Sequence, residues 1–272
     1  MRKITALLSV LALAFGLSAC GGPSEPGPAA TDPTEPPYKT VYVHSAITQE
    51  FGSTVSRTEY VFDDMDRVTE VIVYTNDVET KRHSVQCDEN GNYTKWTSDG
   101  SVMEYTYDGE GHSLGMTMYI DGQEVSTTAY TWERGLRTSA ITRMAGQDMT
   151  QKVLMTYDSG DKLLRQDSYS AETLDSYSVY AYDADGRVAA MTTYHPDGSI
   201  YSIASHSWEG DTQTIITTDP VGSVMQTAIL TYDEAGNLLT HTVYNLYGDQ
   251  VSKETHTWKA IQVDPDCPRA SV

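Results

Sequence analysis

The chain is poor in cysteine, phenylalanine and basic residues, and each shortage excludes a class of protein. Three Cys in 272 residues are too few for a disulfide-built scaffold. Lys and Arg number 18 against 38 Asp and Glu, so the formal net charge is −20. Because nucleic-acid binding relies on cationic side chains that release counterions, we expect no nucleic-acid partner. Only 3 Phe stand against 19 Tyr, which favours half-wet sheet surfaces over a thick core.

Motifs of catalysis and of metal binding are also missing. The sequence has no HExxH, CxxC or Gly-x-Ser-x-Gly. His206 and His256 each lie two residues before a Trp, so they read as structural repeat positions. The many turn Asp residues are expected to cap their own backbone, and they lack the glycine-rich pattern of calcium β-rolls. We therefore expect no enzyme, no catalytic residue, no metal site and no cofactor.

Residues 1–19 have the pattern of an export signal. Arg2 and Lys3 precede an apolar run that ends at Leu17 and is too short for a comfortable membrane span. The run Leu17-Ser18-Ala19-Cys20 resembles the lipobox of bacterial lipoproteins. The resemblance implies cleavage before Cys20, a diacylglycerol on its sulfur, and anchoring at the outer face of the cell membrane, or at the outer membrane of a Gram-negative cell. Several acyl chains hold a protein stably on a membrane.

Residues 20–37 predict a tether between this anchor and the rest of the chain. Six of the ten Pro lie there, together with several Gly, and no apolar periodicity is present. At ~3.1 Å per residue, such a tether extends over roughly 50 Å. At the other end, residues 263–272 predict a flexible tail that contains Cys267. A disulfide between Cys87 and Cys267 is one open possibility, and a small buried side chain at Cys87 is the other.

Between these segments, residues 38–262 repeat with a period of about 25 residues. An aromatic residue followed by an acid marks most units. We call these aromatic positions, together with the one that Cys occupies, the anchors: Phe62, Cys87, Tyr107, Trp132, Tyr157, Tyr182, Trp208, Tyr232 and Trp258. Such a short, fixed period indicates a repeat architecture, which usually provides a binding surface or a spacer.

Each unit predicts two β-strands joined by tight turns. In the unit that follows Tyr182, Asp185-Gly186 and Asp197-Gly198 separate β-rich runs, and Gly accepts the positive φ of such turns. We expect an all-β domain of 16–18 antiparallel strands in one meander. Accumulated twist should coil this sheet into an open ribbon or a partly rolled shell, with strand edges free at both ends.

The turns also carry a family resemblance. Tyr182-Asp183-Ala184-Asp185-Gly186-Arg187-Val188 and Tyr232-Asp233-Glu234-Ala235-Gly236-Asn237-Leu238 resemble the YD repeat, also called the RHS repeat. The Tyr-x-x-Asp-Gly half of the units resembles MORN repeats more loosely. The YD resemblance implies a β-sheet scaffold; in that family, long arrays form shells around toxic domains, and some members are linked to carbohydrate binding or cell contact. With few repeats, this chain is not expected to close a large shell.

Two rows of aromatic residues are the candidate binding sites. One row comprises the Tyr found 12 residues after five of the anchors: Tyr74, Tyr119, Tyr169, Tyr194 and Tyr244. The other row comprises Trp132, Trp208 and Trp258. Such rows stack on sugar rings or anchor protein partners, although they also simply cover a sheet.

The sequence thus predicts a lipid-anchored, non-catalytic binding module of the bacterial envelope. Its partners would be the membrane, through the lipid on Cys20, and an envelope or host glycan or a protein. Two alternatives remain open: a structural spacer without a small ligand, and an RHS-like shell fragment that shields a partner polypeptide.

Overall fold

The computed structural model describes residues 39–147 and 150–263, which form one all-β domain. No helix among these residues is long and apolar enough to cross a membrane. Eighteen strands follow one another in a single antiparallel sheet. They are β1 (Lys39–Phe51), β2 (Thr54–Phe62), β3 (Val68–Thr75), β4 (Val78–Cys87), β5 (Tyr93–Ser98), β6 (Ser101–Tyr107), β7 (Ser113–Ile120), β8 (Gln123–Glu133), β9 (Leu136–Met144), β10 (Thr150–Tyr157), β11 (Leu163–Ser170), β12 (Thr173–Tyr182), β13 (Val188–Tyr194), β14 (Ile200–Glu209), β15 (Thr212–Thr218), β16 (Val224–Tyr232), β17 (Leu238–Asn245) and β18 (Gln250–Val263).

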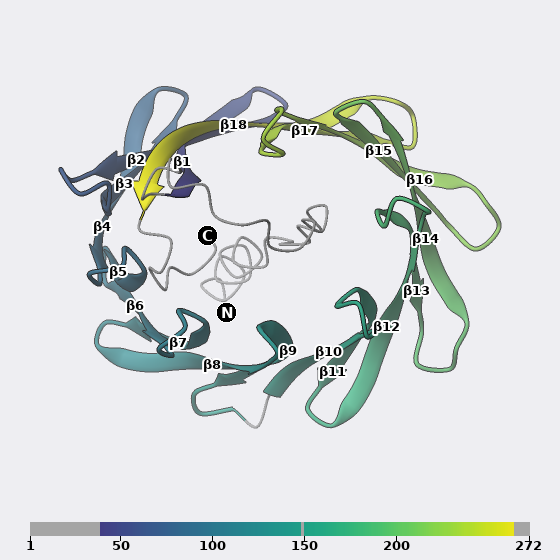
Figure 1. Ribbon diagram of the computed structural model, residues 1–272, viewed down its shortest axis with the longest axis horizontal. Helices are drawn as coiled ribbons and strands as arrows, with labels where there is room; N and C mark the ends of the chain where they lie inside the picture. Colours follow the sequence, from purple (N-terminus) through teal and green to yellow (C-terminus); the bar gives the residue numbers. More distant parts are fainter. Residues whose placement is uncertain (1–38, 148–149, 264–272) are drawn as a thin grey trace, which may run out of the picture.

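The sheet closes on itself into a barrel (Figure 1), because the first and last strands pair along most of their length. Their register runs from Lys39 opposite Val263 to Glu50 opposite Lys253. The antiparallel meander is confirmed, but the expectation of an open ribbon with free edge strands is wrong. Closure removes both edges, which would otherwise leave a row of unpaired backbone groups on each side.

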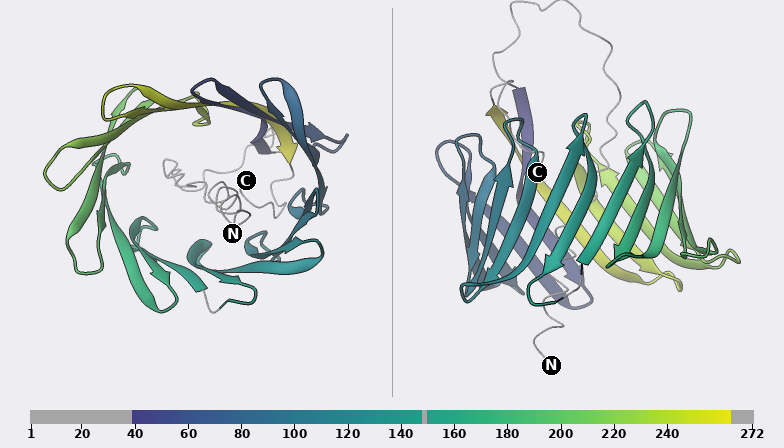
Figure 2. Two further views of the ribbon diagram at one scale, coloured as in Figure 1. Left: turned by 180° about the vertical axis from the view of Figure 1, so that it is seen from behind. Right: turned by 90° about the horizontal axis from the view of Figure 1, so that it is seen from below.

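The barrel has two unlike rims (Figure 2). One rim holds the turns that follow the even-numbered strands; we call it the capped rim. The chain enters and leaves the barrel at this rim, since Lys39 pairs with Val263. The other rim holds the turns that follow the odd-numbered strands, and we call it the distal rim.

Asx caps hold most turns of the capped rim, and Asp219 and Asn245 cap two turns of the distal rim in the same way. In the turn after β12, one oxygen of Asp183 accepts the backbone N–H groups of Asp185 and Arg187. The Asp183 N–H itself bonds to the Arg187 carbonyl, and Gly186 takes a φ of 81°. Asp63, Asp88, Asp108, Asp158 and Asp233 accept the equivalent pairs. The acid of each Tyr-Asp motif is therefore a turn cap, as the sequence predicts.

Side chains at the anchor positions point into the lumen, and their sequence neighbours point outward. In a closed sheet, inner side chains converge and shield one another. Most buried strand residues are in register with the anchors: Val71, Val85, Met116, Met118, Thr128, Ala140, Ala204 and Ala228. Exposed apolar residues such as Val61, Val179 and Ile216 take the opposite register.

The handedness of the backbone gives the same assignment. The Asp183 N–H bonds to the Arg187 carbonyl, on the side of β13. Because backbone N–H and C=O groups alternate in direction along a strand, those of Tyr182 and Tyr180 point to β11 instead. Strands follow one another counter-clockwise in Figure 1, and even-numbered strands such as β18 end toward the viewer. For L-residues, this combination sends the side chains of Tyr180 and Tyr182 inward.

Adjacent units are joined by the polar tips of the anchors. The Tyr182 hydroxyl donates to the carbonyl of Leu163, at the start of the preceding strand, over 2.8 Å. Tyr107, Tyr157, Trp132 and Trp258 donate to the equivalent carbonyls of Tyr93, Arg137, Ser113 and Leu238. Phe has no donor for this bond, which explains the preference for Tyr and Trp at these positions.

Tyr182→Phe is expected to lower the free energy of unfolding by about 1–2 kcal/mol, because the Leu163 carbonyl loses its donor in a half-buried place. Denaturant unfolding measures the change. The matched control is Tyr119→Phe at an outward position, where we expect a change within about 0.5 kcal/mol. Equal effects of the two variants would contradict the linking role of the anchor hydroxyl.

Candidate binding surfaces

The Tyr row lies on the outer face, close to the distal rim. Each member pairs with a residue of the preceding strand: Tyr74 with Arg57, Tyr119 with Val102, Tyr169 with Lys152, Tyr194 with Tyr177, and Tyr244 with Thr227. The Arg57 guanidinium lies 4.2 Å from the centre of the Tyr74 ring, and the Lys152 ammonium 4.6 Å from that of Tyr169. Tyr194 stacks on Tyr177 at 4.8 Å. The five Tyr therefore form one outer belt, as the spacing predicts.

The Trp row lies on the opposite face, in the lumen at the capped rim. Trp132 and Trp258 use their indole N–H groups to join units, so both have a structural role. Trp208 differs, because its buried Nε1 has no hydrogen-bond partner among the described residues. Its ring lies 5.5 Å from that of Tyr232 and 5.1 Å from the Arg187 guanidinium. The two predicted rows thus do not form one site.

The lumen wall combines aromatic and Met side chains with uncharged polar ones such as Gln166, Ser178 and Gln213, and it carries few charges away from the rim. Inward positions along the strands include Tyr60, Trp96, Met103, Tyr105, Met116, Met118, Tyr130, Met155, Tyr180, Met191 and Leu230. Basic side chains gather at the capped rim, where Lys162, Arg187 and Lys259 lie over the rings of Tyr182, Trp208 and Phe62. The acids occupy mainly turns and outward positions.

The lumen is too wide for its own side chains to fill. With 18 strands about 4.8 Å apart and a tilt of about 40°, opposite backbones are roughly 35 Å apart. Barrels of this strand number leave an interior space beyond the side chains. The buried polar atoms without a partner among the described residues are His83 Nδ1, Trp208 Nε1 and His256 Nε2. All three belong to inward-facing residues and lie beneath neighbouring side chains, so the lumen wall holds buried hydrogen-bonding groups that the barrel itself does not pair.

Titratable side chains meet in the lumen where the barrel closes. His44 Nε2 of β1 lies 3.1 Å from His256 Nδ1 of β18. Glu254 accepts a hydrogen bond from Gln49 at 2.9 Å and lies 3.9 Å from His241 of β17. The pKa of His44 is lowered to about 4, mainly because the ring is buried and secondly because His256 lies beside it. Burial likewise lowers the pKa of His256, and the nearby His241 imidazole lowers the pKa of Glu254. We call the four titratable residues, His44, His241, Glu254 and His256, the seam cluster.

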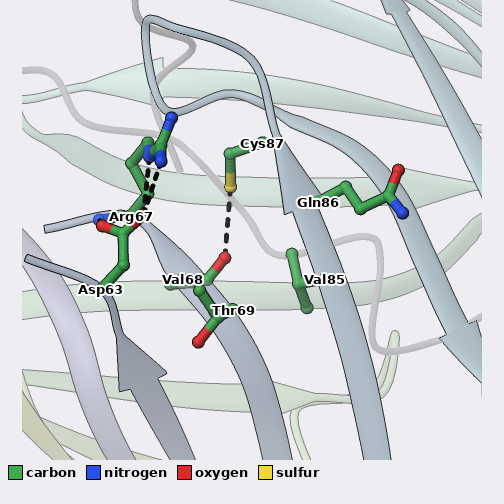
Figure 3. Close-up of a pocket in the computed structure, with 7 residues that line it drawn as sticks. All are labelled: Asp63, Arg67, Val68, Thr69, Val85, Gln86 and Cys87. Carbon is green, nitrogen blue, oxygen red and sulfur yellow. Dashed lines mark hydrogen bonds and ion pairs between the residues drawn. The ribbon is translucent and has the colours of Figure 1, made fainter. Parts of the chain in front are cut away.

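A pocket lies beside the one anchor position without an aromatic ring (Figure 3). The Cys87 thiol donates to the Val68 carbonyl at 3.4 Å, in the same way as the Tyr and Trp anchors. Cys87 packs against Val68, Val71 and Val85, which supports the prediction of a small packed side chain. Arg67 and Asp63 form an ion pair at the edge of the pocket. Cys267 lies outside the described residues, so the disulfide stays a prediction.

One cluster within the described part of the chain has the side chains for a metal ion: Asp108, Glu110 and His112. Asp108 already accepts two backbone N–H groups of its turn. His112 lies 3.0 Å from a carboxylate oxygen of Asp108 and stacks on Trp132 at 4.8 Å. These contacts account for the cluster as a capped turn of the repeat.

Comparison with known proteins assigns no family. No protein-family model matches the sequence, and no curated protein matches it. A porin-like protein from Bacteroides uniformis overlaps with 82% of this chain and 98% of its own, at 12% identity and a TM-score of 0.39. A porin-like protein from Bacteroides vulgatus overlaps with 79% of this chain and 98% of its own, at 9% identity and a TM-score of 0.29.

A third similar structure is TcdB2-TccC3 without its hypervariable C-terminal region. It overlaps with 70% of this chain but only 14% of its own length, at 15% identity and a TM-score of 0.26. At these identities and TM-scores, the similarities carry no information about function.

Proposed function

We propose that this protein is a lipid-anchored, non-catalytic binding protein of the bacterial cell envelope, and that it holds its ligand against the lumen wall. The lumen wall supports this, because it places aromatic rings such as Tyr180 and Trp208 beside uncharged polar side chains such as Gln166. Aromatic faces stack on sugar rings or peptide planes, and hydrogen-bonding groups among them give orientation. The anchor on Cys20 and the tether over residues 20–37 rest on the sequence.

The chemistry of the wall favours an uncharged chain molecule, which is a glycan strand or an extended polypeptide. A strongly anionic ligand would face the net charge of −20. A compact globular partner would not enter a lumen of this width, whereas a single strand would contact the rings and the polar side chains of the wall together. Of these two ligand classes, glycans use ring stacking most directly.

The first experiment is a glycan array probed with residues 38–272, which contain every described strand. Trp208→Ala should weaken binding of the selected glycan roughly tenfold or more, because the mutation removes an aromatic ring of the lumen wall. Circular dichroism should stay unchanged. Tyr119→Ala, on the outer face, is the matched control and should bind normally.

Equal binding by Trp208→Ala and the wild type would contradict a ligand in the lumen. A folded protein that binds no glycan would favour a polypeptide ligand, which an array of extended peptides tests with the same two variants.

A further inference from the structure

The distal rim carries an exposed apolar surface that has no part in the proposed binding in the lumen. The turns after β13, β15, β17, β1 and β3 follow one another around the barrel, since β18 pairs with β1. Each bears large apolar side chains in solvent. They are Ile200 and Tyr201, Val221 with Val224 and Met225, Leu246 and Tyr247, Phe51, and Val78. Val221 is 87% exposed and Tyr247 is 80% exposed. We call this set the apolar tips.

The capped rim has a smaller and more scattered apolar surface, with Leu114, Leu164 and Leu239 exposed singly near the starts of β7, β11 and β17. Its turns consist mainly of capping acids and of polar or small residues, and among their described residues Met65, at 66% exposure, is the one large apolar side chain that is so exposed. The tips on the other half of the distal rim, such as Asp99-Gly100, Asp121-Gly122 and Ala171-Glu172, carry small or charged residues. Among the described residues, the most exposed apolar side chains are therefore found mainly on one half of one rim, which marks an interaction surface.

The outer wall next to the tips of β13–β17 is also poor in charge, whereas the wall next to the tips after β1 and β3 carries ion pairs. Tyr194, Tyr244 and Tyr74 of the outer belt lie next to the tips. Across β13–β17, which are described throughout, Glu209 is the one charged residue at an outward position. The outward face of β2–β6 is different, because it carries ion pairs such as Arg82 with Glu70 and Lys95 with Glu104.

We infer that the apolar tips rest on a lipid surface made of zwitterionic phospholipid. At a bilayer surface, apolar side chains enter the acyl region and aromatic side chains prefer the headgroup level above it. The apolar tips and the belt of Tyr beside them have this same order. The hairpins that carry the tips splay apart (Figure 1). A fluid lipid surface fills the gaps between splayed tips, whereas the surface of a folded protein would touch them only in places.

Charge and chain length support the same occupant. The tip turns contain Asp77, Asp197, Asp219 and Asp249 and no Lys or Arg, so anionic lipid headgroups would repel them. The chain leaves the barrel at the capped rim, and strands of about ten residues give a wall roughly 25–30 Å high. A tether over residues 20–37 that extends roughly 50 Å is long enough to run past this wall. Thus an acyl anchor and the apolar tips are able to occupy the same leaflet.

The test is partitioning of residues 38–272, without lipid, onto vesicles in a flotation assay. We expect binding to phosphatidylcholine vesicles and weaker binding when phosphatidylglycerol is added. The triple variant Val221→Ser, Leu246→Ser and Tyr247→Ser should lose at least tenfold of the partitioning. Met65→Ser on the capped rim is the matched control and should partition like the wild type. No partitioning by the wild type, or equal partitioning by the triple variant, would overturn the proposal.

Val221→Trp gives a second measurement that does not depend on the fold of the triple variant. Its indole should be quenched by brominated phosphatidylcholine, whereas the inward-facing Trp96, Trp132, Trp208 and Trp258 should not. An unquenched indole would overturn the lipid assignment, as would release of a trapped dye, which indicates that the barrel crosses the bilayer. The assay contains no glycan and no acyl anchor, so its failure leaves the proposed lumen function untouched.

Discussion

Ending the chain at Asp249, so that β18 is lost, is expected to abolish the native fold. β18 pairs with β17 on one side and with β1 on the other. Without it, β1 and β17 both become edges with long rows of unpaired N–H and C=O groups. The two edges cannot pair in the same way, because β1 and β17 run in the same direction around the barrel. We expect loss of the cooperative thermal transition and sedimentation as aggregates.

The matched control for this truncation ends at Val263, the last residue of β18. It keeps every described strand and should melt like the full chain. Analytical ultracentrifugation together with thermal circular dichroism distinguishes the two truncated proteins. A monomeric, cooperatively melting protein that ends at Asp249 would show that the seam between β1 and β18 is dispensable, and closure would then not be the main source of stability.

Acidification is expected to weaken the barrel at this same seam. The pKa of His44 is about 4 in the folded chain, against about 6.5 for an unperturbed His. Between pH 6.5 and pH 4, His44 therefore binds a proton in the unfolded chain but stays neutral in the folded chain. The stabilising contribution of neutral His44 is complete above pH 6.5 and is lost as the pH falls toward 4. After allowance for solvent screening, the loss is about 2 kcal/mol.

The groups that face His44 set the size of this effect. His256 and Trp258 lie beside it on β18, Tyr60 faces it from β2, and Glu254 partly offsets the penalty of its charge. The pKa of His256 is lowered mainly by burial, so His256 acts in the same direction. Glu254, whose pKa is also lowered, loses its own contribution only at still lower pH.

Denaturant unfolding between pH 7 and pH 4 measures this loss, with His44→Gln as the test variant. Gln keeps a hydrogen-bonding side chain but takes up no proton, so the variant should lose less stability than the wild type over the same range. Burial lowers the pKa of His83 and His206 as well, so part of the acid sensitivity should remain in the variant. Parallel pH profiles for the two proteins would exclude the seam cluster as a source of acid sensitivity.

The repeat made the strands and turns predictable, because local residues decide them. Tyr182-Asp183 and Gly186 specify a strand end, a cap and a turn within a few positions, so the meander follows from the sequence. Closure was not predictable in this way. It depends on the pairing of Lys39 with Val263, which lie at opposite ends of the described chain and outside the repeat motif. Accumulated twist alone does not say whether the two ends meet.

The candidate sites were predictable only in part, for a related reason. Spacing correctly placed Tyr74 and Tyr244 in one row, and Trp132 and Trp208 in another. It did not show which row faces the lumen, since that depends on the direction in which the sheet curls. The seam cluster was not predictable, because His44 and His256 lie 212 residues apart and share no motif. The apolar tips escaped notice because single residues such as Val221 and Tyr247 form no pattern until the turns stand side by side.

The two-stranded unit also determines how such a ring changes in size. A unit begins and ends at the same rim, so gain or loss of a whole unit by gene duplication or deletion always leaves the first and last strands antiparallel and able to pair. Each step changes the circumference by two strands, or the backbone diameter by about 4 Å. A lineage of such rings would therefore grow in fixed increments, with the seam conserved and the bore adjusted to different ligands.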